Sequence, residues 1–309
     1  MKVSEYSPEE FIRQVRRDSV LLHIGPFSVR VRSPLEDVAA GIHLHYEDYF
    51  VSDQEFADFH VTVEPPRGFR KWFHPQVNFI FDGYTPFKPL PRDQAFAMFE
   101  WGLNWCISSF AQDYFLLHAA VVEKNGFAAV LPAPPGAGKS TLCAGLVSRG
   151  WRLLSDELTL IPVNEPRQVI PVPRPISLKN ASIDVMRDFA PGAVIGPIVR
   201  DTTKGTVAHM RAPAESVLRG CETARLKWIV FPQYKPASPT ILAPRAKTRS
   251  FMEIATQSFN FSILGETGFG ILKQVISDCD CCDFIYSDLD EAIATFDSLA
   301  DGQQDICAA

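Results

Sequence analysis

Residues 131–141 read Leu-Pro-Ala-Pro-Pro-Gly-Ala-Gly-Lys-Ser-Thr, and this stretch decides the expected fold. It follows an apolar strand predicted at residues 127–131 and leads into a helix predicted to begin at Lys139. Gly136 and Gly138 can adopt positive φ without a Cβ clash, so consecutive backbone N–H groups of the loop can point at one anion. The helix that follows turns the positive end of its dipole toward the same place. The stretch therefore predicts a loop that binds phosphate groups.

The loop matches the pattern G-x-x-x-x-G-K-[ST], except that Ala133 stands where the first glycine belongs. In this pattern the lysine contacts the β and γ phosphates, and the hydroxyl after it ligates Mg²⁺. An ordinary Pro/Gly turn between a strand and a helix would not require Lys-Ser-Thr at the helix start. We therefore expect ATP and Mg²⁺ as ligands, although the motif itself does not distinguish ATP from GTP. The phosphates are expected to lie against Pro135, Gly136, Ala137, Gly138, Lys139, Ser140 and Thr141.

Two acids follow the loop. Asp156 and Glu157 stand at the end of a short strand predicted at residues 152–154, and the chain from Lys139 to Asp156 is long enough for one helix and one return strand. The acids are thus expected to lie beside the phosphates. Two adjacent acids can divide into a metal ligand and a general base, whereas solvated turn residues would do neither. Spacing alone does not decide which acid takes which role.

The segment before the loop predicts an antiparallel hairpin. Residues 114–122 form an apolar run, Asn125-Gly126 marks a tight turn, and the chain returns at 127–131. The loop therefore follows a hairpin instead of the first strand of a parallel βαβ unit, which indicates a mixed sheet. His118 lies alone in the apolar run, where a histidine is either a core residue or a functional one.

These residues carry a family resemblance. The stretch from Leu117 to Leu160 resembles the catalytic domain of HPr serine kinase/phosphorylase through His118, Val121-Val122, the loop from Gly136 to Ser140, Ser148-Arg149-Gly150-Trp151 and Asp156-Glu157. The chain is more closely similar to the bacterial HPr kinase-related kinases, whose further pattern appears at residues 201–211 and in Phe259-Asn260-Phe261. The resemblance covers roughly residues 20–298.

The resemblance implies a fold and a reaction. It implies an α/β, phosphoenolpyruvate carboxykinase-like P-loop kinase domain with a mixed sheet at residues 93–309, preceded by a β-rich α+β region at 1–92. It further implies transfer of the ATP γ-phosphate to a hydroxyl group. The chain lacks the Arg-Gly-Leu-Gly-rich signature of HPr kinases, so neither the reverse phosphorolysis nor HPr itself as substrate is expected. Because HPr kinases are oligomers, the resemblance also implies a homo-oligomer.

The family's functional residues map onto five positions of this chain. By resemblance Lys139 clamps the phosphates, and Ser140 and Glu157 hold Mg²⁺. Asp156 accepts the proton of the acceptor hydroxyl, with a metal-ligand role for it left open. His118 pairs with the two acids and tunes them.

Residues 190–213 contain few large apolar side chains and several basic ones, which predicts a mobile basic loop. Such a loop can neutralise charge that develops on a transferred phosphoryl group, and Lys204 and Arg211 are the candidates. Charge kept only for solubility is the alternative.

Local signals also place elements in the N-terminal region. Ser7-Pro8-Glu9-Glu10 is a capping box that opens a helix to about Arg17, and residues 20–24 and 27–31 form a hairpin around Gly25. Residues 93–111 give the longest helical pattern, apolar around most of its circumference, which is typical of a helix between two layers.

Composition bounds the function. The chain has 309 residues, 46% of them hydrophobic, so it can bury a large core. Its net charge of −6 and the lack of a long basic run argue against a nucleic-acid surface. No signal-peptide pattern and no apolar segment of about 18 residues occurs, so we expect a cytoplasmic protein without a membrane partner. Seven cysteines, an odd number, do not indicate a disulfide framework.

The leading hypothesis is a Mg²⁺/ATP-dependent kinase that phosphorylates a serine or threonine hydroxyl of a small protein or precursor peptide. A small-molecule hydroxyl is a close variant as acceptor. A nucleotide-gated regulatory module with weak ATPase activity is the alternative from another class.

Overall fold

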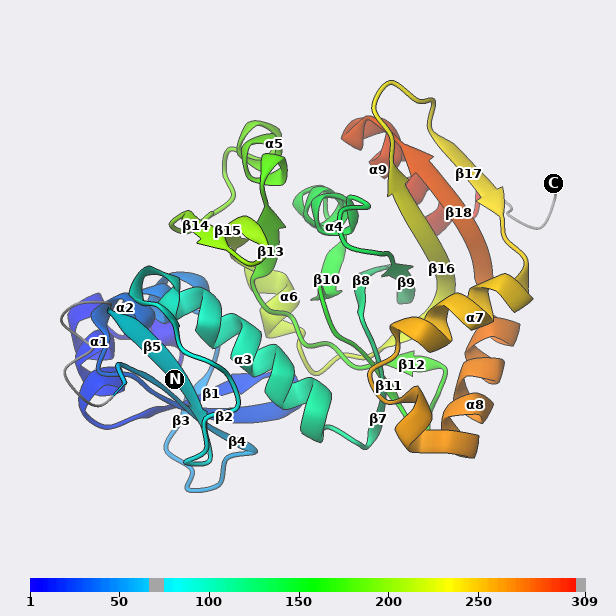
Figure 1. Ribbon diagram of the computed structural model, residues 1–309. Helices are drawn as coiled ribbons and strands as arrows, with labels where there is room; N and C mark the ends of the chain where they lie inside the picture. The colour runs from blue at the N-terminus through cyan, green and yellow to red at the C-terminus, as the bar shows by residue number, and fades with distance from the viewer. Residues whose placement is uncertain (67–74, 304–309) are drawn as a thin grey trace.

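The computed structural model describes residues 1–66 and 75–303. Figure 1 shows a mixed α/β molecule in which an N-terminal group of elements, coloured blue to cyan, lies beside a larger group coloured green to red. The sequence predicted an α/β fold with a mixed sheet after a β-rich region, and the structure is mixed α/β with several sheets.

The N-terminal group is built on a six-stranded sheet. In spatial order its strands are β3 (Val51–Ser52), β1 (Val20–Ile24), β2 (Phe27–Arg32), β4 (Phe59–Glu64), β5 (Gln76–Phe81) and β6 (Leu90–Pro91). All neighbours are antiparallel except β2 and β4, which are parallel. The helical elements of this group are η1 (Val3–Glu5), α1 (Pro8–Arg17), α2 (Glu36–His45), η3 (Arg92–Gln94) and α3 (Ala95–Phe110).

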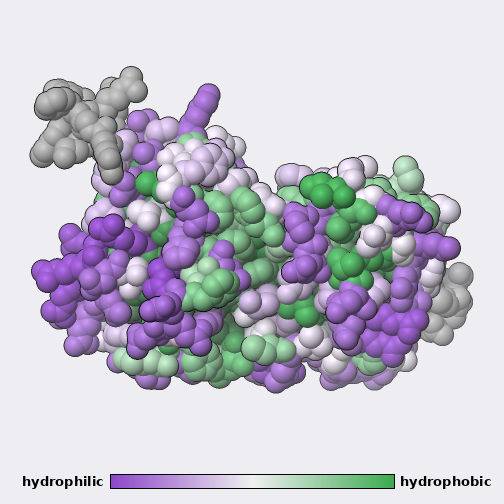
Figure 2. Space-filling view, turned by 90° about the horizontal axis from the view of Figure 1, so that it is seen from below, coloured by the Kyte–Doolittle hydropathy of each residue, from purple (hydrophilic) through white to green (hydrophobic). Residues whose placement is uncertain are grey.

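Helix α1 forms where the capping box predicts it. The Ser7 side chain accepts a hydrogen bond from the Glu10 N–H, and the Glu10 carboxylate accepts one from the Ser7 N–H. Phe11 and Val15 are buried, whereas the arginines of the helix are exposed. Seen from below, hydrophilic residues gather at the end of the molecule where α1 lies, and apolar residues gather toward the middle of this face (Figure 2).

Helix α3 is buried on several sides because it lies between the two groups. It contacts β4 and β5 of the N-terminal sheet, and its side chain Asn104 reaches Glu157 of the larger group. The expected boundary between residues 92 and 93 falls within η3, just before this helix. The division into two domains stays a prediction, since one hydrophobic cluster includes residues of both groups.

The larger group is built on a seven-stranded mixed sheet. Its order is β10 (Arg152–Ser155), β8 (Ala119–Lys124), β9 (Phe127–Pro132), β16 (Ala224–Tyr234), β18 (Asp280–Tyr286) and β17 (Ile241–Pro244), with β12 (Gln168–Val169) paired to β16. Strand β16 is parallel to β9 and β18, whereas β8 is antiparallel to both β9 and β10, and β17 is antiparallel to β18. The hairpin turn is the expected Asn-Gly type, with φ of 56° at Asn125 and 83° at Gly126.

Helices cover both faces of this sheet. Ala129 and Leu131 of β9 join a core cluster with α4 (Lys139–Ser148) and α9 (Leu289–Ala300). Ala128 and Val130 join a second cluster with α7 (Lys247–Gln257) and α8 (Phe261–Asp278). Successive residues of a strand point to opposite faces, so a strand covered on both sides is apolar throughout, as residues 127–131 are. The remaining helices are α5 (Ala181–Phe189) and α6 (Ala214–Leu218).

The prediction of a single strand at residues 114–122 is wrong. The chain forms β7 (Tyr114–Leu117), which pairs with β11 (Thr159–Pro162) in a two-stranded sheet, and then β8, which belongs to the large sheet. The break falls at His118, whose N–H donates to the Gln257 carbonyl. An uninterrupted apolar run carries no signal that the chain passes from one sheet to another.

The prediction of a loop at residues 190–213 is also wrong in part. Strands β14 (Val199–Thr202) and β15 (Gly205–Met210) form a hairpin that pairs with β13 (Ile176–Lys179) in a three-stranded sheet. Lys204 lies in the hairpin turn, with Gly205 next to it at a φ of 84°. Part of the basic segment is therefore a β-hairpin, and Lys204 lies at its tip.

Among the residues described, no helix combines the length and the apolar character needed to span a bilayer.

Candidate functional site

The loop at residues 133–138 joins β9 to α4 and is held from the neighbouring strands. The Ala137 carbonyl accepts a hydrogen bond from the Tyr234 N–H at 2.9 Å, and the Tyr286 hydroxyl donates to the Gly138 carbonyl at 2.9 Å. Gly138 has a φ of 89°, and a Cβ there would lie 2.5 Å from the Tyr286 hydroxyl. Glycine is thus required by both backbone conformation and close approach.

The geometry of the loop also accounts for alanine at position 133, where the motif has glycine. It is buried at the end of β9 and is not among the residues of positive φ, so this position does not need the glycine of the motif. Pro134, Pro135 and Gly136 form the exposed crest of the loop, and Gly136 has a φ of 86°.

The start of α4 offers free donors. Among the described residues, none accepts a hydrogen bond from the N–H of Gly138, Lys139, Ser140 or Thr141. Lys139 is 9% exposed, and its side chain likewise has no ion pair or hydrogen bond with a described residue. These free donors and the unpaired ammonium lie at the positive end of a helix dipole, where an anion is favoured.

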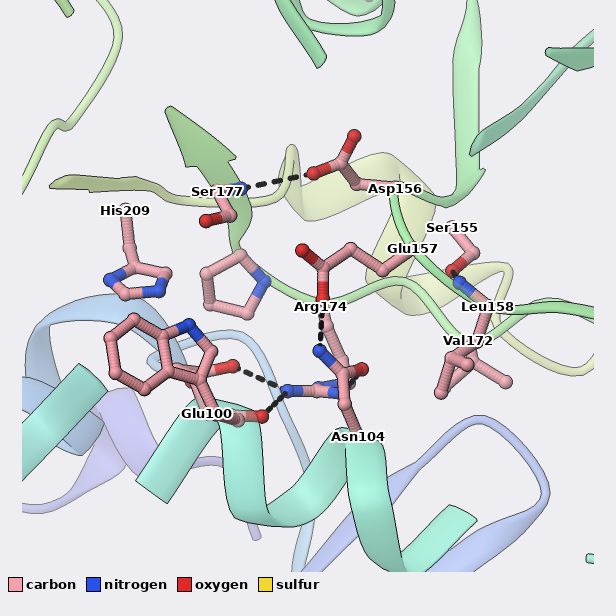
Figure 3. A pocket seen from close by; sticks show the side chains of 12 residues that line it. Glu100, Asn104, Ser155, Asp156, Glu157, Leu158, Val172, Arg174, Ser177 and His209 are labelled. Carbon is pink, nitrogen blue, oxygen red and sulfur yellow. Dashed lines mark hydrogen bonds and ion pairs between the residues drawn. The ribbon is translucent and has the colours of Figure 1, made fainter. Parts of the chain in front are cut away.

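Asp156 lies directly beside this helix start. Its Oδ2 accepts a hydrogen bond from the Ser140 hydroxyl at 3.2 Å. The same oxygen accepts one from the Ser177 N–H at 3.1 Å, which Figure 3 shows. Its Oδ1 is buried and has no hydrogen-bond partner among the described residues. Burial raises the pKa of Asp156, with Glu157 adding to the shift and Lys139 opposing it. One carboxylate oxygen is therefore engaged and the other is free for a ligand.

Glu157 lies in a more positive environment. Asn104 donates a hydrogen bond from its amide to Oε2, and the Lys179 ammonium lies 3.8 Å from Oε1. Burial on its own would raise the pKa of Glu157, but the positive charges of Lys204, Lys139 and Lys179 outweigh it and hold the pKa below its usual range. Glu157 is therefore charged at neutral pH.

A cleft of about 710 Å³ opens beside Glu157. It separates α3 from the segment that joins α7 to α8, and its lining includes Trp101, Trp105, His118, Pro134, Glu157, Lys204 and Phe259. Its volume is in the range of small-molecule binding sites. Asp156 does not line this cleft, whereas Glu157 does.

His118 and Lys204 come to the same cleft from different elements. Burial, with the charge of Lys139, lowers the pKa of His118 to about 4, so its imidazole is neutral at neutral pH. The Lys204 ammonium lies 5.0 Å from the centroid of the Trp101 ring. Burial lowers the pKa of Lys204, and the charge of Glu157 acts in the opposite direction.

Arg211 is not brought to this cluster. It forms an ion pair with Glu47 of the N-terminal group, and its N–H donates to the Val194 carbonyl. The other expected residues of the site, from Pro135 to Thr141 with His118, Asp156, Glu157 and Lys204, do gather around the loop and the cleft.

Two residues of the site were not predicted from the sequence. Asn104 contacts Glu157 from a helix far away in the chain, and Ser177 contacts Asp156 through its backbone. Neither contact has a local sequence signal. Arg174 and Lys179 follow the two acids in the chain, and both lie near Glu157, Arg174 through Asn104.

Comparisons with known proteins do not identify a family for this chain. No model of a protein family matches this chain, and no curated protein matches it. Among solved structures, the HPr(Ser) kinase/phosphatase from Coxiella burnetii is similar, with 12% sequence identity over 60% of this chain and 96% of that chain, and a TM-score of 0.28. A likeness of this size carries no argument about function.

Proposed function

We propose that this chain is a Mg²⁺/ATP-dependent kinase that transfers the γ-phosphate to a hydroxyl group. The observation that carries the proposal is the position of Asp156. Its carboxylate accepts a hydrogen bond from Ser140 in the first turn of α4, and its second oxygen is buried and unpartnered among the described residues. An unpaired lysine and four free backbone donors lie at the same helix start.

The loop and the helix start bind the nucleotide phosphates in this proposal. Backbone N–H groups from Gly138 to Thr141 donate to phosphate oxygens, and Lys139 neutralises the β and γ phosphates. Pro135 and Gly136 belong to the exposed crest over them, and Ala137 follows half-buried.

Mg²⁺ fits the donors that are present. The Ser140 hydroxyl and the free Oδ1 of Asp156 are oxygen ligands, and Mg²⁺ commonly takes one or two carboxylates and completes its shell with waters and phosphates. Among the described residues no group of three or more His, Cys, Asp or Glu gathers, so the protein offers only part of a coordination shell. When bound, Mg²⁺ would neutralise charge on the transferred phosphoryl group.

The two acids take roles that differ from those expected by resemblance. The hydrogen bond joins Ser140 to Asp156, which favours these two residues as the metal ligands. Glu157 lines the cleft and is charged, so in this proposal it accepts the proton of the acceptor hydroxyl. Lys204 neutralises charge at the cleft, and neutral His118 lies against the acceptor.

The cleft is the proposed acceptor site. Its aromatic walls and its volume suit a side chain of a peptide or small protein, or a small molecule, that carries a hydroxyl group. The geometry does not favour one of these classes over the others.

Nucleotide binding tests the first half of the proposal. Calorimetric titration with a non-hydrolysable ATP analogue and Mg²⁺ should give binding to the wild-type chain, and Lys139→Ala should weaken it by about 10-fold or more. Lys273→Ala is the matched control, because Lys273 is an exposed lysine of α8 far from the loop in sequence. Equal binding by Lys139→Ala and wild type would refute the phosphate role of the loop. Binding without any phosphate transfer would instead favour the nucleotide-gated module.

A further inference from the structure

The carboxylate of Glu157 is held by a side chain of the N-terminal group. The amide nitrogen of Asn104, on α3, donates to Oε2 of Glu157, as Figure 3 shows. The two residues are 53 positions apart in the chain.

The orientation of the Asn104 amide is fixed by a second contact. Arg174 donates from Nη1 to the amide oxygen of Asn104. A guanidinium can only donate, so the oxygen of the amide must face Arg174 and its N–H₂ group must face Glu157. The amide therefore presents a donor to the acid in a single orientation.

Arg174 is itself held by a buried ion pair. Its Nη2 donates to Oε2 of Glu100 at 2.6 Å and to the Glu100 carbonyl at 2.8 Å. The side chains are 8% and 3% exposed, and the Tyr46 hydroxyl donates to the other carboxylate oxygen at 2.7 Å. Buried pairs of this kind are costly to leave unsatisfied, so the arginine has little freedom to move away from Asn104.

The space around this network is small. Glu100, Asn104, Glu157 and Arg174 all line a cavity of about 20 Å³, which is room for one water molecule. Glu157 therefore cannot swing into this space without displacing its neighbours. With Oε2 engaged by Asn104, Oε1 is the oxygen left for other partners, and Lys179 lies 3.8 Å from it.

We propose that Asn104 is a positioning residue for Glu157. It holds the carboxylate so that Oε1 can accept the proton of the acceptor, and the ion pair of Arg174 with Glu100 keeps Asn104 in place. The N-terminal group thus supplies part of the active site and is more than a scaffold beside it. The inference rests on the function proposed above.

The variant Asn104→Asp tests this role with the least change of shape. It keeps an oxygen for Arg174 and removes the donor to Glu157. In the absence of the acceptor, water takes the phosphoryl group and gives its proton to Glu157, and this release of phosphate from Mg²⁺/ATP should show a kcat lower by about 10- to 100-fold, as expected when a reacting group is misplaced by an ångström or so. The dissociation constant of the non-hydrolysable ATP analogue, measured by calorimetry, should stay within about 2-fold of wild type, because the phosphate loop is untouched.

A matched control and a double variant separate positioning from stability. Asn78→Ala lies in β5 of the same N-terminal group, and the Asn78 side chain makes no hydrogen bond among the described residues. It should leave kcat unchanged. In a Glu157→Gln background, adding Asn104→Asp should lower kcat no further, since the residue acts only through Glu157.

Three results would count against the account, and they are distinguishable. Wild-type kcat in Asn104→Asp would refute the positioning role alone. A further loss of kcat in the double variant would show that Asn104 acts by another route and would also refute it. A wild-type chain that neither binds the analogue nor releases phosphate would refute the proposed function and this role with it.

Discussion

Replacing Gly138 with alanine should destabilise the protein, because the added Cβ both strains the backbone and crowds the tyrosines that pack against the loop. At a φ of 89° any side chain is strained, and the new Cβ would lie 2.5 Å from the Tyr286 hydroxyl and 2.9 Å from the Tyr234 Cβ. The strain costs about 1–2 kcal/mol, the overcrowding about 1–3, and the lost hydrogen bond from Tyr286 about 1. Together these give a loss of roughly 3–6 kcal/mol in the free energy of unfolding.

The matched control is Gly150→Ala. Gly150 has a φ of 96°, and nothing lies within 4 Å of an added Cβ, so this variant carries the backbone strain without the crowding. It should lose only about 1–2 kcal/mol. Urea unfolding followed by circular dichroism measures both variants against wild type. If their losses agree to within about 0.5 kcal/mol, crowding against the tyrosines contributes nothing and the reasoning fails.

Three further predictions concern buried charges and the metal. Burial lowers the pKa of His45 and of His209 to about 4 from 6.5, so both are neutral when folded and charged when unfolded between these values. The free energy of unfolding should therefore fall as pH drops from 6.5 toward 4, by up to about 3 kcal/mol for each histidine in urea titrations. Glu100→Gln leaves the buried charge of Arg174 without its anionic partner and should cost about 3–5 kcal/mol in the same assay. Chelation of Mg²⁺ by EDTA should abolish phosphate transfer, and excess Mg²⁺ should restore it, because Asp156 offers its free oxygen to the ion.

Each of these has a control. His209→Gln should flatten the loss of stability in acid, whereas replacing the exposed His60 should not; equal slopes would contradict the role of burial. Asp184→Asn removes an exposed partner at 3.8 Å from Arg187 and should lower the free energy of unfolding by less than about 0.5 kcal/mol. An equally small loss in Glu100→Gln would show that the buried ion pair contributes no more to stability than an exposed one. Undiminished transfer in excess EDTA would exclude a metal requirement.

Local signals in the sequence were sufficient where local physics decides the structure. The capping box at Ser7 and the Asn125-Gly126 turn produced the elements they predicted, because the hydrogen bonds and φ angles involved lie within a few residues. The same holds for β9 and α4 around the phosphate loop, whose boundaries follow the apolar run and Gly138.

Other features depend on contacts that no short window contains. The break at His118 arises because β7 pairs with β11 and β8 with β9, a choice made by distant strands. Arg211 looked like a phosphate ligand from its segment, but its partner is Glu47 across the molecule. Asn104 lies in a helix that is apolar around most of its surface, and only the fold brings Glu157 to it.

The central claim is phosphate transfer that depends on the acids beside the loop. The most direct measurement follows radiolabelled γ-phosphate from Mg²⁺/ATP into peptides, small proteins and small molecules of the source cell, with wild type, Asp156→Asn and Glu157→Gln compared side by side. The account predicts label on a hydroxyl-bearing acceptor with wild type and no label with either variant. Label transferred at the wild-type rate by both variants, or no label with wild type while ATP still binds, would contradict it.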